Sequence, residues 1–237
     1  MKKRTSLTYL NGLNGLIGLV ALLWLLGVVA TSVAAMPSHT ILDEVPVSLR
    51  NDPSGRPLEG SQLDQLLAGK VVSQLMDAPS GMPSPGVALA IIAAPPAKVL
   101  RTLRDYPHLH EFMPYVARAT IDDHTANRWL VSYSIHGPLG IGNREYQLES
   151  FDEKEVIDGL EILISRFSYT GRGNIKDTRG TWRLIPIAGG TATFARYEST
   201  TDPGGSFTPW LKRRIASAGL PKIIQAIRKR VAEPASP

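Results

Sequence analysis

The chain has 237 residues, 43% of them hydrophobic and 20% charged, a composition that excludes disorder of the whole chain and suits one or two domains. Its formal net charge of +5 and pI of about 9.5 raise nucleic acid and anionic membranes as partners. The absence of cysteine excludes disulfides, cysteine nucleophiles and thiolate metal sites.

The N-terminus has the pattern of an export signal. It starts with MKKR, continues as an apolar run over 16–30, and offers small residues at 32–35 at the spacing of a cleavage site. The apolar stretch from about 13 to 33 also approaches the ~20 residues that cross a bilayer, so an uncleaved anchor is the alternative. Both interpretations predict an exported, periplasmic or otherwise extracytoplasmic protein, soluble after cleavage or tethered by an N-terminal transmembrane helix.

More than half of the net positive charge comes from this first segment. Residues 1–35 contain three basic and no acidic residues, which leaves 23 of the 26 basic residues beside all 21 acidic ones. The remainder is nearly neutral and exported, so we expect no nucleic-acid partner.

The segment 36–65 contains four prolines and little apolar periodicity, which predicts a linker or a loosely docked arm. We expect one domain over 66–233, a length that suits a single core. It opens with strand patterns at 70–76 and 87–94, separated by a loop rich in proline and glycine.

Helical spacing follows. Residues 95–106 begin with two prolines and place their apolar side chains on one face, and a second short turn occupies 108–114. Beyond Pro114, apolar and polar residues alternate for about 85 residues through six segments separated by polar or glycine-bearing turns, which predicts an antiparallel meander.

The last segment, 209–233, returns to helical spacing, and we expect Gly219 and Pro221 to bend it. A curved antiparallel sheet with one apolar face needs a cover, and this long helix is the available one. The sequence therefore predicts an α+β helix-grip fold, with the sheet wrapped around a long C-terminal helix and two short helices after the first strands.

Three segments resemble the START/polyketide-cyclase-like (SRPBCC) superfamily, whose members share the birch-pollen-allergen fold. They are IIAAPPAKVLRTLRDYPHLHEFMPYVARATI at 91–121, NREYQLESF at 143–151 and GTWRLIPIAGGTATFARYESTTDPGGSFTPWLKRRI at 180–215. The junction at 202–211 is similar to that of lipid-transfer START domains. Within the superfamily, the chain most resembles bacterial START-domain lipid-binding proteins. The resemblance implies a hydrophobic cavity between the sheet and the C-terminal helix, but it does not specify the ligand.

Strand alternation selects candidates for the wall of this cavity. Along 143–150, Arg144, Tyr146 and Leu148 share the apolar face and should point inward. A charged side chain there needs a partner. Arg144 therefore pairs with a nearby acid or extends to solvent at the sheet edge, or it contacts a polar ligand head. Aromatic stripes serve as plain core or as pocket wall. The predicted ligand-binding residues are Trp129, Tyr133, Arg144, Tyr146, Leu148, Phe167, Tyr169, Trp182, Trp210 and Ile224.

The stretch DPGG at 202–205 predicts a flexible hinge before the C-terminal helix, which would let this helix act as a lid. Its basic residues form either a solvated face or a transient contact with an anionic membrane surface. They are Lys212, Arg213, Arg214, Arg228, Lys229 and Arg230.

Signals for catalysis are weak. His108 and His110 have no third metal ligand in view, and His136, at a strand end, is a general base or a surface residue. We predict no catalytic residue, metal or cofactor, and expect a protein that carries or sequesters a lipid or other hydrophobic small molecule. The alternatives are a cyclase- or hydrolase-like enzyme that uses His136, Arg144 or a tyrosine, and an accessory protein with a filled pocket that binds a partner.

Overall fold

The computed structural model describes residues 40–52, 54–79, 82–137 and 142–233. The export signal or anchor predicted for 1–35 lies outside these ranges. Among the helices of the described ranges, none has the length and hydropathy needed to cross a membrane.

Eight strands form one antiparallel sheet in the described residues, in the order β1-β2-β8-β7-β6-β5-β4-β3. The alternating segments of the sequence become these strands. The polar stretch DEKEV at 152–156, expected to be a turn, belongs to β5 instead, and the chain reverses at Asp158 and Gly159, both at positive φ. The strands are β1 (Val72–Leu75), β2 (Gly86–Ile92), β3 (Val116–His124), β4 (Arg128–Gly137), β5 (Gly142–Ile157), β6 (Leu160–Gly173), β7 (Asp177–Ile187) and β8 (Ala192–Asp202).

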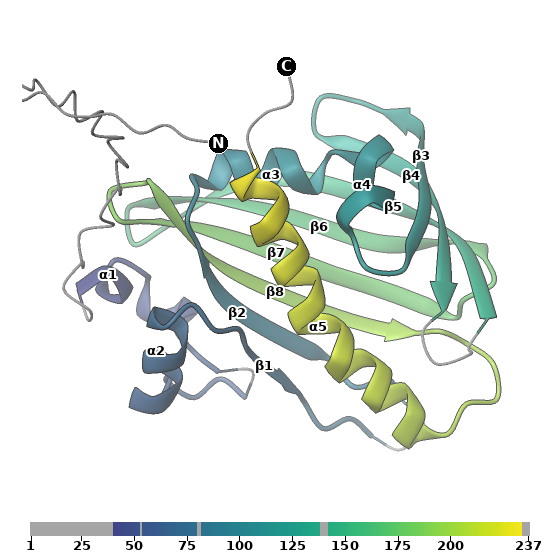
Figure 1. Ribbon diagram of the computed structural model, residues 1–237, viewed down its shortest axis with the longest axis horizontal. Helices are drawn as coiled ribbons and strands as arrows, with labels where there is room; N and C mark the ends of the chain where they lie inside the picture. Colours follow the sequence, from purple (N-terminus) through teal and green to yellow (C-terminus); the bar gives the residue numbers. More distant parts are fainter. Residues whose placement is uncertain (1–39, 53, 80–81, 138–141, 234–237) are drawn as a thin grey trace, which may run out of the picture. The chain divides into compact units, whose positions relative to one another are not determined.

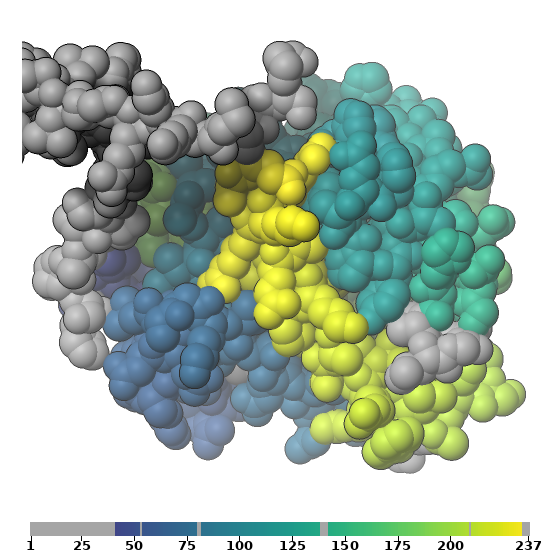
Figure 2. Space-filling view, viewed as in Figure 1, coloured from purple at the N-terminus to yellow at the C-terminus, as the bar shows by residue number. Residues whose placement is uncertain are grey.

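The long helix α5 (Pro209–Ala232) crosses one face of this curved sheet (Figure 1), and in Figure 2 it lies along the surface beside the segment that contains α4. It continues through Pro221 as one helix. Its buried side chains pack against β2, β7 and β8, which confirms the predicted helix-grip fold. The other helical segments are α1 (Thr40–Asp43), the 3-10 turn η1 (Val47–Leu49), α2 (Gly60–Leu67), α3 (Pro96–Leu103), the 3-10 turn η2 (Tyr106–His108) and α4 (Leu109–Phe112).

The segment before β1, expected to be a linker or a loosely docked arm, packs instead on the outer face of the sheet. Its apolar side chains join one cluster with residues of β2, β6, β7 and β8, and Leu66 is completely buried. Prolines interrupt the periodicity of this segment without removing its leucines and valines, so its sequence resembles a linker although five of its apolar residues are buried. The buried members are Leu42, Val45, Leu49, Leu58 and Leu66.

The turn between β8 and α5 is anchored by a buried carboxylate. Asp202, 2% exposed, accepts hydrogen bonds from Lys212 Nζ at 2.7 Å and from the Gly204 N–H at 3.1 Å, and Lys176 Nζ lies 3.7 Å from it. Gly204 and Gly205 adopt φ of +68° and +75°, which favours glycine. Burial opposes ionisation of Asp202, but Lys212 and the Gly204 N–H outweigh it, so the pKa of this carboxyl is lowered. The predicted hinge is therefore tied to α5 by an ion pair.

Replacing Leu66 with alanine is expected to lower the free energy of unfolding by about 2–5 kcal/mol, because it leaves a cavity between α2 and the sheet. Val47, in the same segment and 65% exposed, provides the matched control, and V47A should change stability by less than about 0.5 kcal/mol. Chemical denaturation measures both variants. Equal, small effects would contradict the packing of this segment onto the sheet.

Replacing Asp202 with asparagine should lower the free energy of unfolding by about 1–3 kcal/mol near pH 7, because it removes the buried partner of Lys212. The folded-state pKa of Asp202 lies below the usual ~3.9, so its stabilising contribution is complete above that value and is lost as the pH falls through the lowered pKa. Urea denaturation of wild type and D202N should therefore show a stability difference that shrinks below about pH 4. The exposed Asp64→Asn is the control, and a difference independent of pH contradicts the ionised role of Asp202.

Candidate ligand-binding cavity

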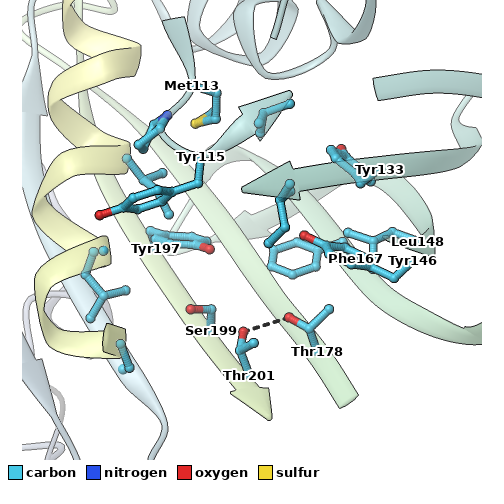
Figure 3. A pocket seen from close by; sticks show the side chains of 18 of the residues that line it. Met113, Tyr115, Tyr133, Tyr146, Leu148, Phe167, Thr178, Tyr197, Ser199 and Thr201 are labelled. Carbon is cyan, nitrogen blue, oxygen red and sulfur yellow. Dashed lines mark hydrogen bonds between the residues drawn. The ribbon is translucent and has the colours of Figure 1, made fainter. Parts of the chain in front are cut away.

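A cavity of about 310 Å³ lies between the inner face of the sheet and α5. Strands β4 to β8 form its floor, the N-terminal half of α5 covers it, and the segment from α4 to the start of β3 forms one side (Figure 3). The helix contributes Ile215, Ala216, Gly219, Leu220 and Ile223, of which two are small enough to leave space beneath it. The volume is at the lower end of the ~300–1,000 Å³ range of small-molecule pockets.

Aromatic side chains make up much of the floor. Tyr133 stacks on Tyr146, its cross-strand neighbour, at a centroid distance of 5.6 Å, and Trp182 stacks on Tyr197 at 4.3 Å. Phe167 lies against Gly180 of the neighbouring strand so closely that a Cβ there would be 2.4 Å from its ring. Cross-strand register and one glycine therefore fix the aromatic surface.

Desolvation in the cavity wall raises the pKa of three tyrosines of this floor, the buried Tyr197 and the half-buried Tyr133 and Tyr146, in the case of Tyr133 well above its ordinary value. Their hydroxyl groups therefore stay protonated at neutral pH. They provide neutral hydrogen-bonding groups within an apolar wall, which is the chemistry of a pocket that orients an uncharged or weakly polar ligand body.

Arg104, at one end of the cavity, forms a largely buried ion pair with Asp152. Arg104 Nε donates to Asp152 Oδ2 at 2.9 Å, and the same guanidinium also contacts Tyr106 and Ser165. Its Cζ atom lies 4.4 Å from the ring centroid of Trp129. Burial opposes the charge of Arg104, but the bonded Asp152 outweighs it and raises the pKa of the guanidinium. Arg104 is thus a cation whose charge is already compensated within the protein.

Arg144 occupies a different part of the wall, and its partners are carbonyl groups. Its Nε donates to the Pro203 carbonyl at 3.2 Å and its Nη1 to the Asn143 carbonyl at 3.1 Å, while Phe207 lies 5.8 Å away under the guanidinium. No carboxylate of the described residues lies within 4.0 Å of it, and the ranges outside the description contain no aspartate or glutamate. The acidic partner considered for Arg144 is absent from the described part of the chain.

Hydroxyl groups line the wall near the end of β8. Thr178 and Thr201 share a hydrogen bond of 2.8 Å across β7 and β8, and Ser199 lies beside them (Figure 3). Pro203, whose carbonyl holds Arg144, follows Thr201 by two residues. Arg144 and these hydroxyl groups therefore lie together at the end of β8.

Tyr115 connects the α4–β3 junction to α5. Its hydroxyl accepts a hydrogen bond from Lys222 Nζ at 3.0 Å, and its φ of +68° is a strained conformation for a tyrosine. Figure 3 shows its ring beside α5 at the cavity wall. This pair bridges the helix to the opposite side of the cavity.

Six of the ten predicted ligand-binding residues line the cavity, as alternation predicts for the strands concerned: Tyr133, Arg144, Tyr146, Leu148, Phe167 and Trp182. Trp129 packs against Arg104 instead, and Tyr169 pairs with Leu148 without reaching the cavity. Trp210 is 67% exposed, and Ile224 is completely buried in the core while its neighbour Ile223 lines the cavity.

Several wall residues were missed. On β8, Tyr197, Ser199 and Thr201 alternate along one face, and this period could have identified them. Arg104 carried no local signal, because its partner Asp152 lies 48 residues away in the sequence. The histidines of the described residues lie outside the cavity: His108 bonds Asp105, and His136 is exposed and contacts Asn143.

The basic residues of α5 are largely engaged within the protein. Lys212 bonds Asp202, Arg228 donates to three backbone carbonyls, and Arg230 pairs with Asp105, Glu111 and Glu233. Arg213 contacts Asp77 and Ser84 at the exposed surface. Among the described residues, Arg214 and Lys229 have no carboxylate within 4.0 Å, so the predicted basic face is smaller than its sequence indicates.

Comparisons with known proteins are consistent with this geometry. A solved STAR-related lipid transfer protein (fragment 25–204) from Xanthomonas axonopodis matches with a TM-score of 0.61 at 20% identity, over 69% of this chain and 94% of that one. Human StAR-related lipid transfer protein 5 matches with a TM-score of 0.59 at 11% identity, over 68% and 82%. At these identities the likeness shows the fold. A search of curated proteins finds no match.

The family model described as polyketide cyclase / dehydrase and lipid transport matches residues 87–233, from β2 to the end of α5. This range contains nearly the whole of the cavity wall, and it confirms the resemblance seen in the sequence. The chain belongs to the polyketide cyclase / dehydrase and lipid transport family.

Proposed function

We propose that this protein binds a lipid or other hydrophobic small molecule in the cavity beneath α5, and carries or sequesters it without chemical change. The observation that carries the proposal is the cavity of about 310 Å³ with its aromatic floor. Apolar surface that a ligand buries there is worth about 25 cal/mol per Å², so useful affinity needs no cofactor. The family and the lipid transfer proteins of the same fold support this class of ligand.

The chemistry of the wall favours binding over catalysis. The three tyrosines of the floor have raised pKa values and hold their protons at neutral pH, which makes them poor bases. Arg104 is paired with Asp152, and His136 is not among the residues that line the cavity. The open volume also argues against an accessory protein whose pocket is filled by its own side chains.

We further propose that residues 1–35 direct export, so that the ligand is met outside the cytoplasm. Contact with an anionic membrane surface is proposed at one end of α5. There Trp210 and Met82 are 67% and 63% exposed, and Arg214 lies over the Trp210 ring at 5.6 Å. Arg213 donates to Ser84 at 3.0 Å, which links the loop of Met82 to the helix. An exposed indole beside cations suits a lipid headgroup layer.

The central proposal is tested by filling the cavity. Ala216 of α5 lines it and Ala218 is exposed on the same helix, so A216F and A218F make a matched pair. We expect A216F to reduce uptake of lipid from host membrane extract at least tenfold, because the added ring occupies the ligand's space, and A218F to bind as wild type. Extraction and mass spectrometry of the bound lipid measure both. Equal uptake by folded A216F and A218F would place the ligand outside this cavity.

The membrane contact is tested with residues 36–237, which form one compact unit without the apolar N-terminus. Changing both Trp210 to alanine and Arg214 to glutamine should weaken binding to vesicles containing anionic lipid by roughly fivefold or more, since each cation near such a surface contributes about 1 kcal/mol. Lys229→Gln, toward the other end of α5, is the control. Co-sedimentation that is the same for the double variant and wild type would refute this contact.

A further inference from the structure

Two arginines line the cavity, and they differ in their electrostatic state. Arg104 has a bonded carboxylate, Asp152, whereas Arg144 has carbonyl oxygens alone among the described residues. A guanidinium carries five N–H groups, and the bonds of Arg144 to the Pro203 and Asn143 carbonyls use two of them. Arg144 therefore keeps donor capacity and an uncompensated charge at the wall of a largely apolar cavity.

The surroundings of Arg144 strengthen this positive field. Arg144 binds the carbonyl of Pro203, while Lys212 and Lys176 approach Asp202, the residue just before it. Three cations thus lie around the turn after β8, where Asp202 supplies one negative charge. Asp177, opposite Asp202 in the β7–β8 ladder, is paired with Arg179 at 2.5 Å. A ligand that brings a negative group to this place would complete the charge balance, and it would meet the hydroxyls of Ser199 and Thr201 on the same wall.

From these observations we infer that the ligand is a single-chain amphiphile with a carboxylate head, and that Arg144 binds this head and selects for it. The inference rests on the proposed function, because it assigns the ligand class of the same cavity. The apolar chain would lie over Phe167 and the stacked Trp182 and Tyr197, away from solvent.

The size and the charge of the site indicate the class of ligand. A cavity of about 310 Å³ is small for a molecule with two acyl chains, and it suits one chain. One guanidinium balances one negative charge, and its planar array of N–H groups matches the two oxygens of a carboxylate. A neutral head, by contrast, would leave the charge of Arg144 without compensation.

The experiment compares dodecanoate with dodecanol, which share a chain and differ in the charge of the head. Equilibrium dialysis measures binding of each to the full-length protein, stripped of bound lipid and kept in amphipol, after subtraction of the background of A216F, whose cavity is filled. The variants are R144Q, R144K and the control R101Q, which changes an exposed arginine of α3.

We expect R144Q to weaken dodecanoate binding about 10- to 100-fold, the range for loss of a hydrogen bond to a charged group, and to change dodecanol binding less than twofold. R144K keeps the charge without the planar donors and should weaken dodecanoate by a smaller factor. R101Q should bind both as wild type. If R144Q does not fold, R144K replaces it as the test. The ratio of dodecanoate affinity to dodecanol affinity should then be lower in R144K than in wild type.

Three results would overturn the inference while leaving the proposed function in place: dodecanoate binding unaffected in folded R144Q, equal weakening of dodecanoate and dodecanol, or tighter binding of dodecyl phosphate than of dodecanoate. If wild type binds neither dodecanoate nor dodecanol above the A216F background, while the host lipid extract is still taken up, the single-chain class is wrong. If nothing at all is taken up, the proposed function fails with it.

Discussion

The architecture depends on how unevenly α5 packs on the curved sheet. In its C-terminal half, Leu220, Ile224, Ile227 and Val231 are buried against the sheet and α3, so the helix is held close. In its N-terminal half, Ala216 and Gly219 present little volume, and the helix leaves space above the aromatic floor. One helix therefore provides both the core that stabilises the fold and the cover of the cavity.

The charged groups near this helix have two different roles, since some stabilise the fold and one is available to a ligand. Asp202 and Lys212 attach the start of α5 to the end of β8, and Arg104 with Asp152 joins the end of α3 to β5 across a buried contact. Both pairs are compensated within the protein and serve its structure. Arg144 differs in that carbonyl dipoles alone hold it among the described residues. This contrast separates the structural charges from the one best placed to meet a ligand.

The sequence predicts well what depends on local period. Alternation along β5 placed Arg144, Tyr146 and Leu148 on the cavity side, and helical spacing identified the long cover. Helical spacing does not determine the rotation of α5 about its axis to within one residue. The predicted wall residue is Ile224, whereas Ile223 lines the cavity and Ile224 is buried in the core. Contacts between distant segments carry no local signal either. Arg104 contacts Asp152, 48 residues away, and the leucines of the proline-rich segment before β1 are buried against an outer face of the sheet that distant strands make apolar.

The central claim is that one hydrophobic molecule occupies the cavity of this protein. Native mass spectrometry of the protein purified gently from its host, followed by extraction of the bound material, tests it most directly. The account predicts a complex of one chain with one amphiphilic molecule, released on denaturation. A mass equal to the bare chain, unchanged after incubation with host membranes, would contradict it.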